Sequence, residues 1–288
     1  MKRLDSMNPI AVSALYLCAA LIPLVKTDPV LACLFASGAL LNLLLYCGQK
    51  GGHGFSLLLF FGIALLNPLV SHKGVTVLFV MNHNPITLEA LLYGVFTGGI
   101  VLASLYWFRT YSHLMTSDKL LYLFGALSPK LSLVLSMALR YVPLFGQQIK
   151  KVQQAQTACG LYREDNLPDR FRGGMRIFSV MITWALENGI TTADSMTARG
   201  YGLQKRSRFS LFKWTAGDIV LLCASLLLCV CSLLLLQNHT FTFYPVLHMT
   251  SPNPLVTLGY ICYTLLILLP AIIHVKEVLR WRCLTSGM

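Results

Sequence analysis

Two short stretches of the form Ala-x-Gly each end a long helical pattern. The first is Ala158-Cys159-Gly160 and the second is Ala198-Arg199-Gly200. Glycine is enriched just past helix ends, so both stretches predict a helix C-terminus. Arg199 has two interpretations. It could offset the helix dipole, an effect of about 0.3–1 kcal/mol, or it could present a planar guanidinium group to an acidic partner.

Motifs for catalysis and for metal binding do not occur in the sequence. There is no Gly-x-x-x-x-Gly-Lys-Ser/Thr phosphate loop, so we expect that the chain does not hydrolyse ATP itself. His-Glu-x-x-His is absent, and none of the seven histidines forms a spaced ligand pair. Glu89 and Asp218 lie near the ends of apolar stretches, where a hydrated carboxylate is the simpler interpretation than a functional acid. We therefore expect no catalytic residue, no metal site and no cofactor.

The composition places these motifs in a membrane protein. Hydrophobic residues make up 56% of the 288 residues and charged residues only 12%, whereas soluble domains carry about 25% charged residues. A transmembrane helix needs about 17–25 residues, most of them apolar. Six stretches of about this kind predict spans, of which the third is short and the fourth is expected to open with Asn84 as N-cap and Pro85 in the first turn. The predicted spans are approximately residues 8–26, 29–46, 55–70, 86–108, 215–236 and 256–275.

The distribution of lysine and arginine predicts the orientation. If the N-terminus is cytoplasmic, 21 of the 23 basic residues lie on the cytoplasmic side, and only Lys26 and Lys73 lie outside. Basic residues concentrate in cytoplasmic loops, so we expect both termini in the cytoplasm of a cell-membrane protein. The formal net charge of +12 then indicates contact with lipid headgroups or acidic protein partners, and not with nucleic acid.

The same pattern divides the chain into three regions. Residues 1–115 carry four spans, residues 116–214 form a basic cytoplasmic segment, and residues 215–288 carry two spans and a short tail. The middle region contains two long amphipathic helical patterns. Arg140 and Glu187 interrupt their apolar halves, and a spanning assignment would place these charges in hydrocarbon. The expected fold is therefore all-α and multi-pass, with about six transmembrane helices and two long helices at the inner membrane face.

The ends of these two helices are predicted from their flanking residues. The first helix should begin at Ser128-Pro129, because proline is favoured in the first turn, and should end near Gly160. Pro143 is expected to kink it where an apolar half gives way to a polar half, because proline lacks an N–H group. The second helix should begin after Asp169 and end at the second Ala-x-Gly stretch.

Three stretches carry a resemblance to a known family. They are Leu139-Arg140-Tyr141-Val142-Pro143, Ala185-Leu186-Glu187-Asn188 and, most specifically, Ser195-Met196-Thr197-Ala198-Arg199-Gly200-Tyr201-Gly202. From about residue 84 to residue 202 the chain resembles the transmembrane (T) component of energy-coupling factor transporters, a branch of the ABC importers. The resemblance implies a non-catalytic subunit that couples ATP hydrolysis to the uptake of a vitamin or a metal ion. Its implied partners are two cytoplasmic ATP-binding subunits and a membrane-embedded substrate-capture subunit.

The resemblance also implies roles for individual residues. In this family, two Ala-Arg-Gly motifs each dock into a groove of one ATPase subunit. ATPase docking is thus implied for Ala158, Cys159 and Gly160 and for Ala198, Arg199 and Gly200, with Cys159 in place of the usual arginine. The apolar half of the first helix would contact the capture subunit through Leu131, Leu135, Leu139 and Val142.

An integral-membrane enzyme, such as a lipid-modifying or intramembrane hydrolase, is the alternative. Such an enzyme would gather polar, titratable residues at one depth of several spans. Here the polar residues gather in one cytoplasmic segment instead. The transported substrate is not encoded in this chain, because on the leading interpretation another subunit captures it.

Cysteine-accessibility labelling tests the orientation. Single cysteines introduced near Lys50, Asn166 and Arg282 should react only from the cytoplasmic side, and those near Lys73 and Asn253 only from outside. Labelling of position 166 from outside would contradict the whole topology, because the middle region would then face away from cytoplasmic ATPases.

Overall fold

The computed structural model describes residues 7–46, 53–71, 74–81, 84–161, 167–203, 212–237, 239, 241–243, 248–249 and 254–285. The chain divides into two compact units. One comprises Met1–Leu120 with Phe212–Met288, and the other comprises Leu121–Leu211. Among the positions proposed for labelling, Lys50, Lys73, Asn166 and Asn253 lie outside the described residues.

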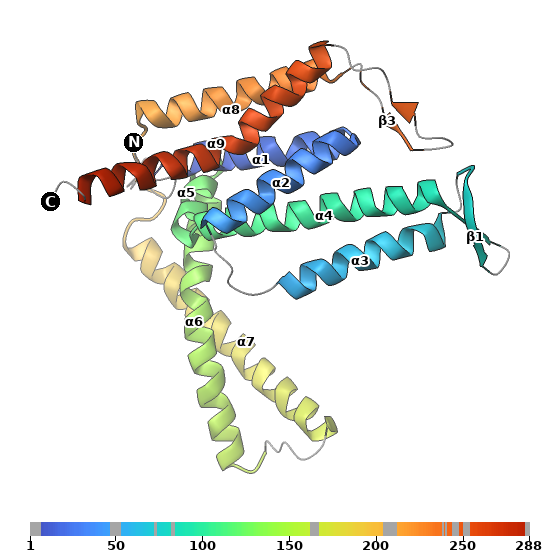
Figure 1. Cartoon of the computed structure of the whole chain (residues 1–288). Coiled ribbons are helices and arrows are strands. Elements are labelled where there is room, and N and C mark those ends of the chain that lie inside the picture. Colours follow the sequence, from blue (N-terminus) through green and yellow to red (C-terminus); the bar gives the residue numbers. More distant parts are fainter. Residues whose placement is uncertain are drawn as a thin grey trace. The chain divides into compact units, whose positions relative to one another are not determined.

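The first unit is built from apolar helices (Figure 1). Five of them are long and apolar enough to cross a membrane, and α1 is an apolar helix of 17 residues, at the lower limit of spanning length. All six predicted spans therefore form helices, and the all-α multi-pass fold is confirmed. The helices are α1 (Pro9–Val25), α2 (Pro29–Tyr46), α3 (His53–Val70), α4 (Leu88–Leu114), α8 (Ala216–Leu235) and α9 (Pro254–Thr285).

The start of the fourth span differs from the prediction. Asn84 is not a helix cap, because residues Asn84–Thr87 form strand β2, which pairs antiparallel with β1 (Val77–Met81). Thr87 is the N-cap of α4, and its hydroxyl accepts a hydrogen bond from the Ala90 N–H at 3.3 Å. The predicted Asn-Pro cap was therefore wrong, because strand β2 comes between Asn84 and the start of α4. A two-stranded ribbon consists only of edge strands, which tolerate proline.

Other boundaries also extend past the prediction. Helix α4 continues to Leu114 and α9 to Thr285, beyond the predicted limits of 108 and 275. A helix satisfies its own backbone at any depth, so it need not end where the apolar side chains end. An 11-residue helix that was not predicted, α5 (Ser117–Leu127), follows α4, and a second short antiparallel pair joins β3 (Phe241–Thr242) to β4 (His248–Met249).

The core of the first unit surrounds α1, which packs against α2, α4, α8 and α9. Its aromatic residues satisfy their polar atoms inside this core. The Trp107 indole N–H donates to the Tyr16 carbonyl oxygen at 3.0 Å, and the Tyr263 hydroxyl donates to the Ala19 carbonyl oxygen at 3.2 Å. Buried aromatic residues of this kind combine apolar contact with one directed bond, and they fix α4 and α9 against α1.

A polar cluster joins the α1–α2 turn to the segment after α8. The Asp28 carboxylate lies 3.4 Å from Nδ1 of His239, and both side chains are almost fully buried. Lys26 donates from Nζ to the Gln237 carbonyl oxygen at 3.0 Å. Burial raises the pKa of the Asp28 carboxyl, and the charge of a protonated His239 opposes that shift. These contacts tie α1 and α2 to α8 at one end of the bundle.

Helices α3 and α4 approach each other closely at glycine. A Cβ atom on Gly94 would lie 2.7 Å from the Ala64 carbonyl oxygen, and one on Gly98 would lie 3.1 Å from the Phe60 carbonyl oxygen. Within a membrane, small residues let helix backbones meet and gain van der Waals contact. Few side chains of α3 are buried, so this glycine contact is a main attachment of α3 to the bundle.

The second unit contains α6 (Pro129–Ala158, 30 residues) and α7 (Leu167–Ala198, 32 residues). Neither belongs to the helices apolar enough to span a membrane. The predicted start of α6 is confirmed, with Ser128 as N-cap and proline at the first helical position. Helix α7 begins at Leu167, slightly before the predicted start. Helix α6 is continuous through Pro143, and the expected kink stays a prediction.

A pair of glycine substitutions on α4 tests the packing against α3. Gly94→Ala should destabilise the protein by about 1–3 kcal/mol, because the added methyl group meets backbone atoms of α3 that cannot rotate away. Gly99→Ala is the matched control, since a Cβ atom there meets nothing within 4 Å. Thermal unfolding in detergent should show a lower Tm only for Gly94→Ala. Equal Tm values would show that α3 is not held at this contact.

Candidate functional site

The two long helices end in the same backbone motif. At the end of α6, the Gly160 N–H donates to the Thr157 carbonyl oxygen at 3.0 Å and the Leu161 N–H to the Gln156 carbonyl oxygen at 2.9 Å. Gly160 has φ 70°, a left-handed conformation that glycine adopts without strain. This pair of bonds is a Schellman cap, which satisfies carbonyl groups that the helix leaves unpaired.

The end of α7 repeats this geometry residue for residue. The Gly200 N–H donates to the Thr197 carbonyl oxygen at 2.9 Å, the Tyr201 N–H donates to the Met196 carbonyl oxygen at 3.0 Å, and Gly200 has φ 81°. Cys159 and Arg199 therefore occupy equivalent cap positions, preceded by Ala158 and Ala198. Both predicted helix ends are confirmed.

Both cap residues are exposed. Their backbones are already bonded within the cap, so the side chains of Cys159 and Arg199 remain available to another molecule. We call the capped C-terminal ends of α6 and α7 the first tip and the second tip. They differ in charge, because only the second tip carries an arginine at the cap. The second tip also contains an additional left-handed glycine, Gly202, with φ 95°.

One of the contacts between α6 and α7 involves Tyr141, which belongs to a stretch that carried the family resemblance. The hydroxyl groups of Tyr141 and Thr192 lie 2.8 Å apart and share a hydrogen bond. The Phe145 ring packs edge-on against Trp184 at 5.5 Å between ring centroids. Asn188 donates from its amide to the Trp184 carbonyl oxygen at 2.8 Å. The Tyr141–Thr192 hydrogen bond and the Phe145–Trp184 ring contact join the two helices, whereas the Asn188 bond lies within α7.

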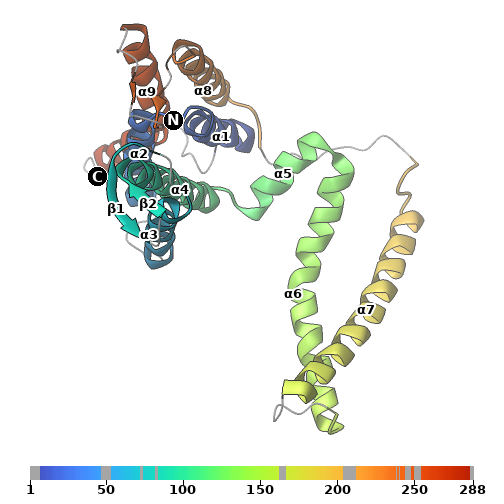
Figure 2. The same cartoon turned by 90° about the vertical axis from the view of Figure 1, so that its right-hand side faces the viewer.

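The order of these contacts makes the helices antiparallel. Tyr141 meets Thr192, whereas the later residue Phe145 meets the earlier residue Trp184. The C-terminal ends of α6 and α7 consequently lie at opposite ends of the pair, as Figures 1 and 2 show. At 1.5 Å per residue, the two tips are separated by on the order of 40 Å. One groove of a partner cannot hold both tips.

The apolar half of α6 is exposed in the chain. The exposed fraction is 58% for Leu131 and 67% for Val142, Leu139 is also exposed, and Leu135 is half-buried. The structure buries no residue of α6 completely within the part of the helix that it describes. A large exposed apolar surface of this kind marks a membrane or protein contact.

Helix α7 presents a second apolar face that the sequence analysis did not assign to a site. Its exposed apolar residues follow each other at intervals of three or four, which places them on one face of a helix. This spacing could have predicted the second apolar face from the sequence. The residues are Leu167, Phe171, Met175, Phe178, Ile182, Leu186 and Ile190.

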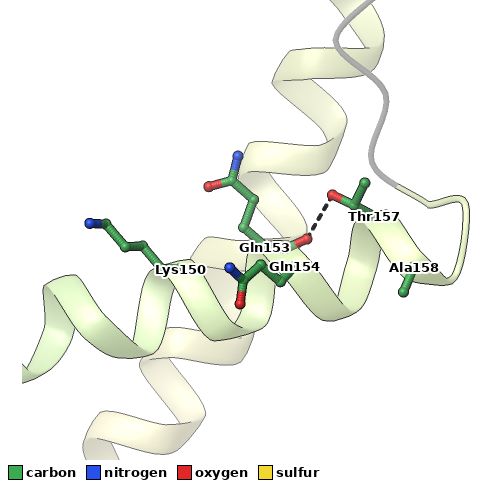
Figure 3. Close-up of a pocket in the computed structure, with 5 residues that line it drawn as sticks. All are labelled: Lys150, Gln153, Gln154, Thr157 and Ala158. Atoms are coloured by element: carbon green, nitrogen blue, oxygen red, sulfur yellow. Dashed lines mark hydrogen bonds between the residues drawn. The ribbon is translucent and has the colours of Figure 1, made fainter.

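An open pocket of about 460 Å³ lies along the last turns of α6. Figure 3 shows its polar lining, in which the Thr157 hydroxyl donates to the Gln153 carbonyl oxygen at 2.9 Å. Lys150, Gln154 and Ala158 complete the lining. The pocket adjoins the first tip, and its amide and ammonium groups suit polar or acidic side chains of a protein partner.

Comparison with known proteins identifies the family. The sequence model of the cobalt transport protein (CbiQ) family matches residues 4–211. The chain belongs to this family. Together with the apolar helices of the first unit, the match places the protein in a membrane.

Curated relatives carry the name energy-coupling factor transporter transmembrane protein EcfT. The chain is 33% identical over 100 residues to EcfT 1 of Listeria monocytogenes, covering 34% of this chain and 38% of the relative. It is 30% identical over 112 residues to EcfT of Lactobacillus helveticus, covering 38% of this chain and 40% of the relative. The matched part thus spans about two fifths of these relatives. The resemblance found in the sequence is confirmed.

Proposed function

We propose that this protein is the transmembrane coupling subunit of an energy-coupling factor importer. It would transmit ATP-driven motion from two cytoplasmic ATP-binding subunits to a membrane-embedded subunit that captures a vitamin or a metal ion. The observation that carries the proposal is the pair of exposed helix ends at Cys159 and Arg199, which share the same backbone cap. The family match and the names of the relatives favour this role over that of an integral-membrane enzyme.

The separation of the tips supports two ATP-binding subunits. Because α6 and α7 are antiparallel, each tip would enter the groove of a different subunit. Ala158, Cys159 and Gly160 would dock at one subunit, and Ala198, Arg199 and Gly200 at the other. Closure of the two subunits around ATP would move the tips relative to each other. The contacts between Tyr141 and Thr192 and between Phe145 and Trp184 would pass that motion along both helices.

The apolar halves of the helices would transmit the motion to the capture subunit. Leu131, Leu135, Leu139 and Val142 on α6 form an accessible apolar surface for a membrane partner or for lipid. The exposed apolar face of α7, around Phe178 and Leu186, would also contact the capture subunit or lipid. With both termini in the cytoplasm, as the distribution of basic residues predicts, the tips would face the cytoplasmic ATPases.

The two cap residues should respond differently to substitution. Arg199→Glu should release one ATP-binding subunit, because truncating one partner of a buried charge pair costs roughly 2–5 kcal/mol and reversing its charge costs more. Cys159→Ala should leave both subunits bound, because cysteine contributes only apolar contact and a weak S–H donor. Copurification of the detergent-solubilised complex measures the stoichiometry of the two ATP-binding subunits.

The control for this experiment is Arg199→Ala with the unfolding temperature measured in parallel. If Arg199 only offsets the dipole of α7, its loss would cost about 0.3–1 kcal/mol of stability. Unchanged ATPase stoichiometry in both Arg199→Ala and Arg199→Glu would reject the docking role.

Aspartate substitutions separate the two surfaces of α6. Leu131→Asp combined with Val142→Asp should weaken binding of the capture subunit, because a charge on this face must be desolvated in the contact. The ATP-binding subunits should still copurify, since the tip is unchanged. Loss of the ATP-binding subunits with retention of the capture subunit would show that the two halves of α6 have the opposite roles.

A further inference from the structure

The tip of α6 receives a positive charge from the other long helix. Arg176 of α7 donates from Nη1 to the Leu161 carbonyl oxygen at 3.1 Å. Leu161 directly follows Gly160, and its own N–H closes the Schellman cap. The guanidinium group therefore lies at the helix end where Cys159 stands in place of arginine.

We propose that Arg176 is the basic docking residue of the α6 tip and that it binds an acidic groove of one ATP-binding subunit. The inference rests on the proposed function of the two tips, and it assigns the charge of the first tip to a residue outside the Ala158-Cys159-Gly160 stretch. The two tips then present the same chemistry by different routes. One arginine belongs to the helix that ends, and the other reaches over from its neighbour.

The donor geometry of Arg176 leaves room for a partner. A guanidinium group carries five N–H donors in a planar fork, and the bond to Leu161 uses Nη1. The remaining donors can bind a carboxylate in the bidentate arrangement typical of arginine–carboxylate pairs. Arg176 is exposed, and its bond to a capped, ordered carbonyl group orients the guanidinium before the partner arrives.

The surroundings of the tip suit an acidic protein groove. Lys150 lines the adjoining pocket with Gln153 and Gln154, and Lys151 is exposed on the same helix. Most exposed apolar residues of α6 lie between Leu131 and Leu144, and the last turns of α6 are mainly polar, although Ile149 and, just past the helix, Leu161 are also exposed. The amide groups of Gln153 and Gln154 suit polar side chains of a protein groove. The exposed apolar residues Phe171 and Met175 of α7 lie near Arg176 and would suit lipid, so binding to anionic vesicles is measured as well. Charge complementarity of this kind orients and selects a partner.

Arg176 also fits a purely structural role. A cation at the C-terminal end of α6 complements the helix dipole, so loss of Arg176 would loosen the α6 cap even without a partner. An experiment on this residue must therefore measure docking and stability separately. It also needs a variant in which another residue supplies a positive charge at the α6 tip in place of Arg176.

Charge relocation provides that experiment. The complex with both ATP-binding subunits is solubilised in detergent, and the affinity of each subunit is measured for Arg176→Ala, for Arg176→Ala with Cys159→Arg, and for Lys130→Ala. Lys130 is the matched control, because it is an exposed cation at the opposite end of α6. Arg176→Ala should weaken one ATP-binding subunit by roughly 10-fold or more. Cys159→Arg should restore most of that loss, and Lys130→Ala should change neither affinity by more than about twofold.

Three outcomes would overturn the inference. Unchanged affinities in Arg176→Ala, while Arg199→Glu still releases a subunit, would leave the proposed function standing without this residue. A lower Tm in Arg176→Ala with no restoration of affinity by Cys159→Arg would show that Arg176 only caps α6. Loss of binding to vesicles of anionic phosphatidylglycerol, with both subunits still bound, would assign Arg176 to lipid. If neither Arg176→Ala nor Arg199→Glu affects either subunit, the proposed function itself fails.

Discussion

A helix that ends in water must satisfy its last carbonyl groups, and this constraint shapes both tips of the second unit. A Schellman cap meets it by turning the chain back on itself through one left-handed residue. Gly160 and Gly200 make that turn possible. The residue before each glycine, Cys159 or Arg199, is exposed at this cap. A capped backbone with an exposed side chain would suit the proposed docking role, because little backbone freedom would be lost on binding.

The first unit meets a different constraint, because lipid supplies no hydrophobic force that pushes apolar helices together. Close packing and directed bonds replace that force. Glycine on α4 brings its backbone against that of α3, while Trp107 and Tyr263 each bond to a carbonyl group of α1. The bundle is thus held by fit and by a few buried hydrogen bonds.

The long helices bury little apolar surface by themselves. Helix α6 has no fully buried residue within its described part, and α7 buries only Gly173 and Met181. A pair of helices with so little shared core gains most of its stability from what covers it. On the proposed function, each exposed apolar face and each capped tip would contact a different partner or lipid. A pair held at a few contacts can also shift more readily than a packed bundle.

The sequence alone determined the features that depend on local chemistry. Apolar runs predicted the membrane helices, Ser128-Pro129 predicted the start of α6, and the two Ala-x-Gly stretches predicted both caps. Each of these follows from residues within one or two turns of each other, where propensity and capping decide the backbone. The same local rule failed at Asn84. Asn84 lies in strand β2, which pairs with β1, and Thr87 caps α4 instead.

The features that join distant residues were decided only by the tertiary structure. The bond between Tyr141 and Thr192 spans 51 positions, and Arg176 reaches the α6 tip across 15 positions. The sequence pattern marked Cys159 as a missing charge but gave no sign that another helix restores one. Helical periodicity states which face a side chain occupies, and it does not state which neighbour that face meets. Only the antiparallel packing of α6 and α7 brings these atoms together.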